Sequence, residues 1–429
     1  KLVNRLADAG VPILGTDPDA IDLAEDRERF GAFMQEIGLP MPEHGTARSA
    51  EEAFKVAERI GYPVIVRPSY VLGGRAMAIV YDEEDLDRYI RSAVKVAEDT
   101  PILIDRFLED AFEMDVDCVS DGEDVRIAAI MEQIERTGVH SGDSACVIPT
   151  VMVGEEALEK IRNYTRRLAR ALRTVGCLNI QYAMKDGEVY VIEANPRASR
   201  TVPYVSKSTG VSWARVACQV VNGLTLDELD VPDEPKLDSY CCKEVVLPFI
   251  KFPGEPAILG PEMRSTGEVM GMDDSFGMAY AKAQMAAGNN LPTDGTVFLS
   301  VNDQDKKDLV PIAQDLADMG FSLVGTRGTA AYLRGRGLDV GIVLKVSEGR
   351  PNGVDMIINE ELDLIINTPL GGRAFSDEHV LRQVAVARGV SVITTLSGAQ
   401  AAAQGIRALH NRRIEVRSLQ EHWHLNIQT

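Results

Sequence analysis

Apolar and polar positions alternate in short segments along the first half of the chain. Helical spacing runs over residues 50–60, and Ser49 with Glu52 has the spacing of a capping box at its start. Two β-branched runs, 62–66 and 76–81, follow with a glycine-containing loop between them, which is typical of a hairpin. Because helical and strand patterns follow each other so closely, this part of the chain is predicted to mix α and β elements.

The middle of the chain predicts a sheet with a long helix against it. In the alternating run 113–119 the carboxylates all fall on one face, since successive side chains of a strand point to opposite faces. Apolar residues at helical spacing predict a helix over about 155–174. The runs 178–184 and 189–193 flank Asp186-Gly187, so they are predicted to form an antiparallel pair.

The last third of the chain predicts a second domain with a doubly wound parallel sheet. Helical segments separate its apolar strand-like runs, which are 297–301, 321–324, 340–346, 362–366 and 390–394. Pro and Asp accumulate at 227–238, which marks a boundary before this domain. We expect the tail of an α/β unit at 1–25, with a short strand at 11–14. A connecting region is expected at 231–295 and a domain at 296–429.

Composition and charge narrow the class of protein. The 429 residues carry a net charge of −20, which provides no general attraction for nucleic acids or anionic membranes. No apolar stretch is long enough to span a membrane, and the six cysteines lack metal-type spacing. We therefore expect a cytoplasmic protein without nucleic-acid or membrane partners. Because the chain begins at Lys1, we also expect it to be a fragment of a longer protein.

Gln181, Glu193 and Asn195 are candidate ligands of a divalent cation. Glu193 and Asn195 lie two positions apart at a strand end, so both offer oxygen ligands of the kind Mg²⁺ prefers on one face. A two-residue turn at 186–187 would direct Gln181 to the other face, whereas a three-residue turn would bring it to the face of Glu193. A metal site therefore predicts the three-residue turn. The alternative is that Glu193 and Asn195 only end a strand and cap a turn.

Arginines and glycines near these residues suit phosphate chemistry. Arg197 and Arg200 follow directly and would bind a phosphoryl group and a small anion, unless they are solvated surface side chains. The loop 68–75 contains Gly73-Gly74 and follows Arg67, so it is predicted to close over phosphates as a flap. A plain hairpin turn is the alternative.

Two further glycine-containing loops are candidates for binding. The loop 137–144 holds His140, for which a structural role and a role in positioning substrate both stay open. The loop 325–329 follows a strand and opens a helix, where free backbone N–H groups can bind an anion. Lys345 and Asn367 lie at two other strand ends of the same predicted sheet edge. No Ser-His-Asp set, HExxH or Walker A motif is present, so the sequence does not support those chemistries.

Several longer strings resemble the carboxy-terminal half of the carbamoyl phosphate synthase large-subunit family. They follow one another in the family's order over essentially the whole chain, at 66–75, 138–144, 193–197, 243–248 and 260–267. The resemblance implies an α/β fold class, with an α+β ATP-grasp domain at 23–230. It also implies a doubly wound methylglyoxal-synthase-like domain at 296–429 and makes 1–22 the remnant of a pre-ATP-grasp domain.

The resemblance also implies an activity and its residues. The reaction would be phosphorylation of carbamate by ATP to carbamoyl phosphate, with Mg²⁺ or Mn²⁺ held by Gln181, Glu193 and Asn195. Arg197 and Arg200 would bind the transferring phosphate or the carbamate, so that they form the catalytic group with Glu193 and Asn195. The implied ATP-binding residues are Arg67, Arg106, Leu108, Glu113, Gly138, Val139, His140, Ser141, Gln181 and Glu193.

Regulation and partners are implied in the same way. A nucleotide effector of the UMP or IMP type would bind residues of the last domain, namely Lys306, Thr326, Thr329, Lys345 and Asn367. The expected partners are the N-terminal half of the large subunit and a glutaminase small subunit, in an enzyme of pyrimidine and arginine biosynthesis; a homo-oligomer is also allowed. Two other interpretations stay open: another ATP-grasp carboxylate-activating ligase, and a nucleotide-binding regulatory module without turnover.

Overall fold

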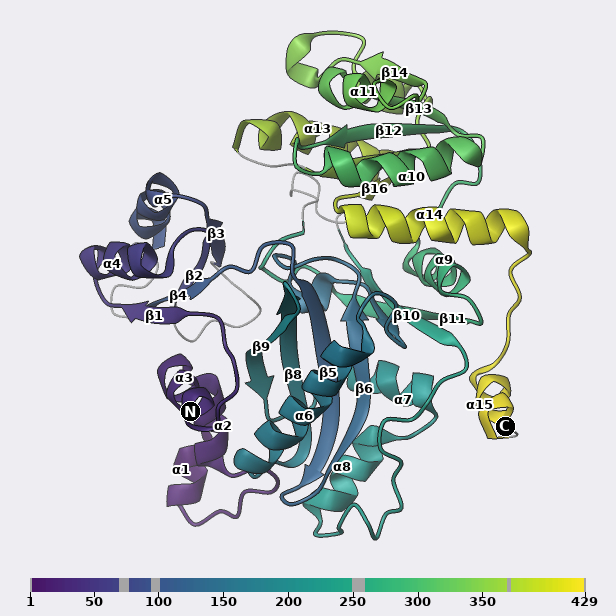
Figure 1. Cartoon of the computed structure of the whole chain (residues 1–429). Helices are drawn as coiled ribbons and strands as arrows, with labels where there is room; N and C mark the ends of the chain where they lie inside the picture. The colour runs from purple at the N-terminus through teal and green to yellow at the C-terminus, as the bar shows by residue number, and fades with distance from the viewer. Residues whose placement is uncertain (1, 69–76, 94–100, 249–258, 369–371, 428–429) are drawn as a thin grey trace.

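The residues that the structure describes are organised by three β-sheets (Figure 1). The computed structural model describes residues 2–68, 77–93, 101–248, 259–368 and 372–427. Most of the predicted flap at 68–75, including Gly73 and Gly74, lies outside these residues. Within them, no helix is both long enough and apolar enough to cross a membrane.

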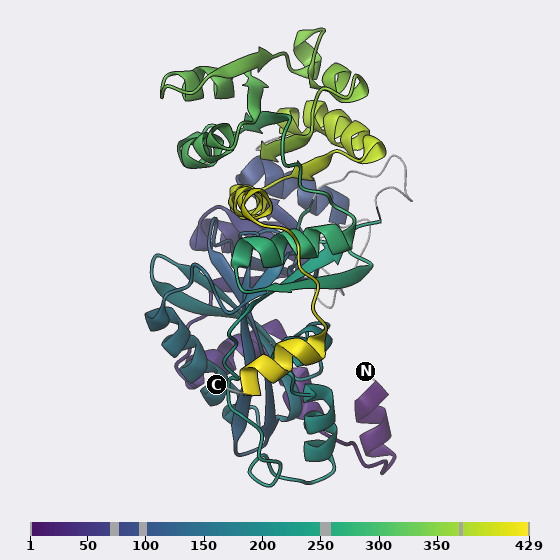
Figure 2. The same ribbon diagram turned by 90° about the vertical axis from the view of Figure 1, so that its right-hand side faces the viewer.

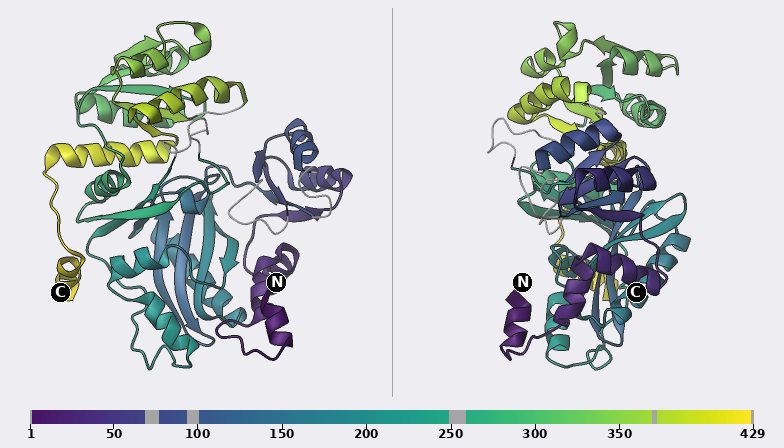
Figure 3. Two further views of the ribbon diagram at one scale, coloured as in Figure 1. Left: turned by 180° about the vertical axis from the view of Figure 1, so that it is seen from behind. Right: turned by 90° about the vertical axis from the view of Figure 1, so that its left-hand side faces the viewer.

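A four-stranded sheet with two helices forms a small lobe at one side of the molecule (Figures 1 and 3). The predicted hairpin is confirmed, because Val64 pairs with Val80 in an antiparallel ladder. The predicted capping is also found: Ser49 accepts from the Glu52 backbone N–H, and the Glu52 carboxylate accepts from Arg48 N. The elements of the lobe are β1 (His44–Ala47), α4 (Ala50–Ile60), β2 (Val64–Pro68), β3 (Ala78–Val80), α5 (Glu83–Ala93) and β4 (Ile102–Arg106).

A seven-stranded sheet in the order β11-β10-β7-β6-β5-β8-β9 forms the body of the molecule. Its strands are β5 (Phe112–Asp121), β6 (Val125–Gln133), β7 (Cys146–Ile148), β8 (Val175–Lys185), β9 (Glu188–Asn195), β10 (Tyr240–Val246) and β11 (Gly267–Asp273). The two strands β10 and β11 come from the segment expected to connect the domains. That segment therefore extends the sheet, because β10 pairs with β7 and β11 pairs with β10, both antiparallel.

The two faces of this sheet differ in chemistry. The long helix α6 (Glu155–Ala171) buries Ile161 and Leu168 against Met114 and Val116 of β5. The opposite face of β5 carries the carboxylates of the predicted acidic run. Beyond that face lie α7 (Val202–Thr209) and α8 (Trp213–Val221), whose own core includes Trp213. Because side chains alternate along β5, one face of the sheet is apolar and packs on α6, and the opposite face carries the carboxylates.

The first residues depart from the sequence prediction. The chain begins with the helices α1 (Leu2–Asp8), α2 (Pro18–Glu25) and α3 (Arg27–Glu36). Residues 11–14 form no strand, so that prediction is wrong. Val11 is 44% exposed and Leu14 is 73% exposed, because no described neighbouring strand offers a ladder for this short apolar run.

The last domain is the predicted doubly wound parallel sheet, with strand order β14-β13-β12-β15-β16. Its strands are β12 (Thr296–Val301), β13 (Ser322–Thr326), β14 (Val340–Val343), β15 (Leu364–Thr368) and β16 (Ser391–Ile393). Its helices are α10 (Lys306–Asp318), α11 (Arg327–Arg334), α12 (Gly353–Ile358), α13 (Gly372–Arg388) and α14 (Leu396–Asn411).

Two helices join the last domain to the body. Helix α14 lies against α9 (Phe276–Ala287), which packs on β10 and β11 (Figure 1). Close approach depends on glycine, since a Cβ at Gly277 would lie 2.4 Å from the carbonyl oxygen of Gln404. After α14 the chain runs back along the body to α15 (Leu419–Ile427), where Trp423 Nε1 donates to the Lys207 carbonyl oxygen at 2.8 Å (Figure 2).

Candidate active site

The turn between β8 and β9 has two residues, not the three that a metal site predicted. Lys185 pairs with Glu188, and the turn residues Asp186 and Gly187 have φ angles of 52° and 81°. Two successive residues with positive φ are the signature of a type I′ turn, whose twist suits a hairpin. Continued without interruption, this ladder would place Gln181 on the face opposite to Glu193.

A β-bulge at Ile192 corrects the register. Tyr182 still pairs with Val191, but the next pair along the hairpin is Gln181 with Glu193, which leaves Ile192 as an extra residue. Residues directly opposite each other in an antiparallel ladder share a face. The bulge therefore places Gln181 beside Glu193, the arrangement that the sequence had predicted by a different route.

Hydrogen bonds connect these side chains to the neighbouring loops. Asn195 Nδ2 donates to Glu193 Oε1 at 2.9 Å, and Arg197 Nη2 donates to Asn195 Oδ1 at 3.0 Å. Gln181 Nε2 donates to Ser141 Oγ at 2.7 Å. Hydrogen bonds thus connect the three candidate metal ligands to Arg197 and to Ser141 of the loop 137–144.

Asp117 holds residues 196–201 against the sheet. This segment carries Arg197 and Arg200 and is called the arginine loop below. The buried Asp117 carboxylate accepts hydrogen bonds from Ser199 Oγ at 2.8 Å, Thr201 Oγ1 at 2.6 Å and Asn179 Nδ2 at 2.9 Å. Burial raises the pKa of Asp117, and these three donors lower it. The sequence placed this carboxylate on a common face with its neighbours but did not show what it binds.

Arg200 lies on the other side of this loop. Its Nε is 3.1 Å from Glu268 Oε1, and its Nη1 is 2.9 Å from Met263 Sδ. Since Glu268 belongs to β11, the segment expected to be a connection supplies a partner of a predicted catalytic residue. The sequence contains no signal for this pairing, because the two residues meet only across the folded sheet.

The charged face of β5 suits a cation. Burial, with Asp115 and Glu193 nearby, raises the pKa of Glu113 to about 8. Burial and the neighbouring Asp117 raise the pKa of Asp115 to about 7. Such accumulated carboxylates, with the oxygens of Gln181 and Asn195, fit hard divalent ions. Within the described ranges, no three His, Cys, Asp or Glu side chains form a metal cluster by themselves, so amide oxygens would complete the ligand set.

Arg67 offers a donor for phosphate. Its Nε is buried and has no hydrogen-bond partner among the described residues, while Asp105 Oδ2 lies 4.0 Å away. A buried unpaired N–H group is costly unless a ligand satisfies it, which fits an ATP phosphate. Arg27 completes the arrangement: it donates to Asp105 Oδ1 at 2.9 Å and to the carbonyl oxygen of Ile192, the bulge residue, at 2.7 Å. Neither Arg27 nor Asp105 stood out in the sequence.

The loop 137–144, for which the resemblance implies nucleotide binding, lies beside the segment between β4 and β5. Thr137 Oγ1 donates to the Leu108 carbonyl oxygen at 2.5 Å. Gly138 has a φ of 107°, and a Cβ there would lie 3.2 Å from both Ile79 of the lobe and Phe107. Val139 follows it in the same loop. The Arg106 side chain points into the small lobe, where its Nη1 donates to the Ile60 carbonyl oxygen at 2.8 Å.

His140 has a local role in the structure. Its Nδ1 accepts from Gly142 N at 2.9 Å, and its backbone N–H donates to the Gly260 carbonyl oxygen at 2.8 Å. Burial lowers the pKa of His140 below its ordinary value, which favours the neutral ring that this capping contact needs. With Nδ1 accepting, Nε2 carries the proton.

The predicted effector residues gather at the carboxyl edge of the last sheet. Thr326 Oγ1 lies 3.2 Å from Thr329 Oγ1, and both side chains are buried. Lys306 Nζ would lie 3.1 Å from a Cβ at Gly328, in the first turn of α11. Buried Asn367 donates to the Ser300 carbonyl oxygen, while its Oδ1 has no hydrogen-bond partner within the described part of the chain.

Lys345 completes this group. It follows β14 and begins a short 3₁₀ turn, in which its backbone N–H donates to Glu348 Oε2 at 3.1 Å. Parallel strands end at a common edge, so the ends of β12 to β15 converge on the start of α11. These residues are a second candidate site, on a different sheet from the one that contains β8 and β9.

Two family models match the chain. The model for the carbamoyl-phosphate synthase L chain, ATP binding domain, matches residues 26–229, and the model for the MGS-like domain matches residues 308–394. The large chain of carbamoyl phosphate synthase from Archaeoglobus fulgidus is 54% identical over 98% of this chain. The one from Gemmatimonas aurantiaca is 54% identical over 99%.

The chain belongs to the carbamoyl phosphate synthase large-chain family. It spans 39% of the length of these two relatives. Both family matches fall inside the expected domains at 23–230 and 296–429, whose exact limits stay predictions.

Solved structures share the fold of the first domain. The biotin carboxylase domain of the Hydrogenobacter thermophilus 2-oxoglutarate carboxylase, in complex with MgADP and bicarbonate, has a TM-score of 0.55 and 18% identity, covering 66% of this chain and 69% of that one. The Thermus thermophilus N5-carboxyaminoimidazole ribonucleotide synthetase has a TM-score of 0.52 and 20% identity, covering 66% and 77%. The predicted fold class, ATP-grasp followed by a doubly wound domain, is confirmed.

Proposed function

We propose that this chain phosphorylates carbamate with MgATP and releases carbamoyl phosphate and ADP. The observation that carries the proposal is the bulge at Ile192, which places Gln181 opposite Glu193 within reach of the arginine loop. A bulge interrupts the ladder and turns a side chain to the other face. We therefore interpret this bulge as serving the alignment of Gln181 with Glu193. Family membership supports the choice of substrate.

Each group has a place in the transfer. A carbamate oxygen attacks the γ-phosphorus of ATP, the bond to the β-phosphate oxygen breaks, and ADP leaves with the electron pair. Arg197 and Arg200 bind the transferring phosphoryl group and the carbamate, while Arg67 holds the phosphates with its unpaired Nε. Gln181, Glu193 and Asn195 would hold Mg²⁺ or Mn²⁺, which would supply positive charge against the phosphates. Asp117 fixes the arginine loop, so its geometry is set before substrate arrives.

The reverse half-reaction tests this proposal. The purified chain is given MgADP and carbamoyl phosphate, and ATP formation is measured. We expect ATP from the parent chain and about a hundredfold less from Glu193→Gln, which keeps the shape but removes the charge. Glu188→Gln is the matched control, because Glu188 begins the same strand and is exposed. ATP formation equal in Glu193→Gln and the parent, or none from a folded chain that binds MgADP, would contradict the proposal.

The whole enzyme requires more than this chain. We infer that the N-terminal half of the large subunit supplies carbamate and that a glutaminase small subunit supplies ammonia, in the cytoplasm, for pyrimidine and arginine biosynthesis. The length of the relatives supports this, since the chain spans 39% of them. Mixing the chain with those two components should restore carbamoyl phosphate formation from glutamine, bicarbonate and ATP.

The second site is proposed to bind a regulatory nucleotide of the UMP or IMP type. Lys306 and Lys345 would bind its phosphate, with Thr326, Thr329 and the unpaired Oδ1 of Asn367 completing the contacts. Calorimetric titration with UMP and IMP tests this, and gel filtration with and without the nucleotide tests for a homo-oligomer. The match to an MGS-like domain favours this enzyme over another ATP-grasp ligase. The connected site favours catalysis over a silent regulatory module.

A further inference from the structure

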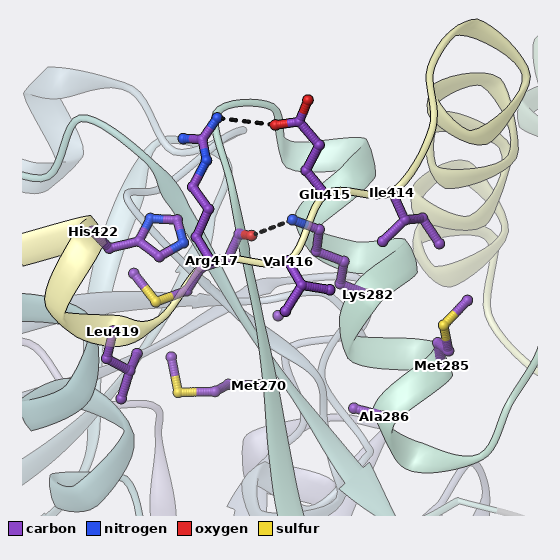
Figure 4. A pocket seen from close by; sticks show the side chains of 12 residues that line it. Met270, Lys282, Met285, Ala286, Ile414, Glu415, Val416, Arg417, Leu419 and His422 are labelled. Atoms are coloured by element: carbon purple, nitrogen blue, oxygen red, sulfur yellow. Dashed lines mark hydrogen bonds and ion pairs between the residues drawn. The ribbon is translucent and has the colours of Figure 1, made fainter. Parts of the chain in front are cut away.

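A cavity of about 330 Å³ is lined by β11 and α9 (Figure 4). The strand β11 is at the opposite edge of the seven-stranded sheet from β9, which carries Glu193. The edge strand β11 and helix α9 form the floor and one wall of the cavity, and the chain segment 414–422 covers only part of it, since Val416 is 93% exposed. The covering segment is tied down beside the cavity. Arg412 forms an ion pair with Asp273 and donates to Ser275 Oγ at 3.0 Å.

Most of the cavity wall is aliphatic. Three methionines contribute from β11 and α9, and three branched side chains contribute from the covering segment; they are Met270, Met272, Met285, Ile414, Val416 and Leu419. Thioether side chains are flexible and polarizable, so such a wall adapts to an aliphatic ligand of irregular shape. A predominantly apolar cavity with a few polar groups is the usual character of a small-molecule site.

The polar groups of the cavity favour an anionic head. His422 is 6% exposed, and its Nδ1 has no hydrogen-bond partner among the described residues. Lys282 Nζ donates to Met272 O at 3.0 Å and Asp273 Oδ2 at 2.8 Å, so these two acceptors use two of its three N–H groups. The carboxylates nearby already face cations, since Glu415 pairs with Arg417 at 3.2 Å and Asp273 pairs with Lys282. The remaining capacity is the third N–H of Lys282 and His422 Nδ1, which donates in the tautomer that carries its proton there.

We propose that this cavity binds a medium-chain aliphatic carboxylate. Its hydrocarbon chain would lie among the methionines, and its carboxylate would accept from His422 Nδ1–H and from the remaining N–H of Lys282. Burial and the cations Arg417 and Lys282 lower the pKa of His422 below its ordinary value, so the ring is neutral and can carry its proton on Nδ1. The site is independent of the phosphoryl-transfer site.

The volume sets the size of the ligand. One water molecule occupies about 30 Å³ of liquid, so a cavity of about 330 Å³ has room for a ligand of roughly ten non-hydrogen atoms. Octanoate has this size and the proposed chemistry. A ligand with so few atoms is expected to bind with a Kd on the order of 1 mM or below.

Calorimetric titration of the full chain with octanoate tests the proposal, with octan-1-ol and octylamine as matched probes. We expect saturable binding of octanoate, and at least about tenfold weaker binding of the other two, because neither satisfies buried donors with a negative charge. His422→Leu should weaken octanoate binding by about tenfold or more for the same reason.

A second variant separates this cavity from other apolar surfaces. Ala286 lies at the cavity on an exposed part of α9, so Ala286→Phe fills space without disturbing the core. Ala287→Phe, one residue further along and outside the cavity lining, is the matched control. We expect binding to be lost in Ala286→Phe and unchanged in Ala287→Phe. Equal binding of all three probes, no saturable binding to the folded chain, or equal affinity of the two phenylalanine variants would overturn the proposal.

Discussion

At the scale of single residues, a few buried polar side chains set the geometry of the site. Asp117 accepts from three side chains, two of which, Ser199 and Thr201, bracket Arg200 in the sequence. A carboxylate can accept all of these bonds at once, because ionised Asp offers acceptors only. The position of the arginine loop therefore depends on the charge state and shape of one buried group.

Substituting this carboxylate by its amide should loosen the arginine loop. Asp117→Asn turns an acceptor into a donor that faces the Ser199, Thr201 and Asn179 donors, so a buried hydrogen bond is lost and another donor is left unpaired. We expect kcat of the reverse half-reaction to fall by about a hundredfold, with the Kd for MgADP little changed. Steady-state kinetics and a nucleotide titration measure the two quantities.

The control for this variant is Asp186→Asn in the exposed turn between β8 and β9, where asparagine also accepts a positive φ. It should leave both quantities unchanged. A loss of MgADP binding in Asp117→Asn that matches its loss of kcat would point to general disruption of the domain and contradict the positioning role.

At the scale of elements, a buried ion pair joins helix α3 to two strands of different sheets. Arg27 pairs with Asp105 of β4 at 2.8 Å and donates to the Ile192 carbonyl oxygen of β9. The lobe that carries Arg67 is thus tied to the bulge that aligns Gln181 with Glu193. An extra residue in a strand leaves its carbonyl oxygen without a ladder partner, and Arg27 satisfies it.

Breaking this pair should destabilise the protein. Arg27→Met leaves the buried Asp105 carboxylate without that charge partner, which costs about 3–5 kcal/mol in the free energy of unfolding. Denaturant unfolding measures it. Arg29→Met on the same helix is the matched control, since Arg29 pairs with Asp19 in solvent and its removal should change little. Equal destabilisation by the two substitutions would show that the buried pair has no special role.

At the scale of the whole molecule, the small-residue contact between α9 and α14 joins the MGS-like domain to the ATP-grasp body. Gly277 faces Gln404, and Gly405 faces Tyr280 and Leu291. Helix α9 also reaches the body directly, because Gln284 Nε2 donates to Glu244 Oε2 of β10 at 2.5 Å. A shift of α14 would therefore reach, through α9, the sheet that carries the proposed catalytic residues.

Separating these helices should uncouple the two sites. In Gly277→Ala the new Cβ would lie 2.4 Å from a backbone oxygen, so α14 must move. We expect the response of the reverse half-reaction to UMP or IMP to be lost, while ATP formation without nucleotide stays within about twofold. Gly154→Ala is the control, because a Cβ there meets nothing within 4 Å. A nucleotide response equal in both variants would rule out this contact as the route.

Much of the architecture follows from local patterns in the sequence. The hairpin of β2 and β3, the long helix α6, the acidic face of β5 and the parallel order of the last domain all follow from side-chain periodicity and turn residues. These patterns are local, so the sequence shows them directly. The candidate ligands Gln181, Glu193 and Asn195 also came from spacing and resemblance.

Only the tertiary structure decided the remaining features, because they depend on residues distant in the chain. The turn at Asp186-Gly187 is the short form, and the bulge that restores the face of Gln181 has its extra carbonyl satisfied by Arg27, far away in the sequence. The apolar run at 11–14 has no strand partner among the described residues, whereas β10 pairs with β7 and β11 pairs with β10. A strand pair or a buried ion pair joins two residues, and the sequence alone does not show which distant residues meet.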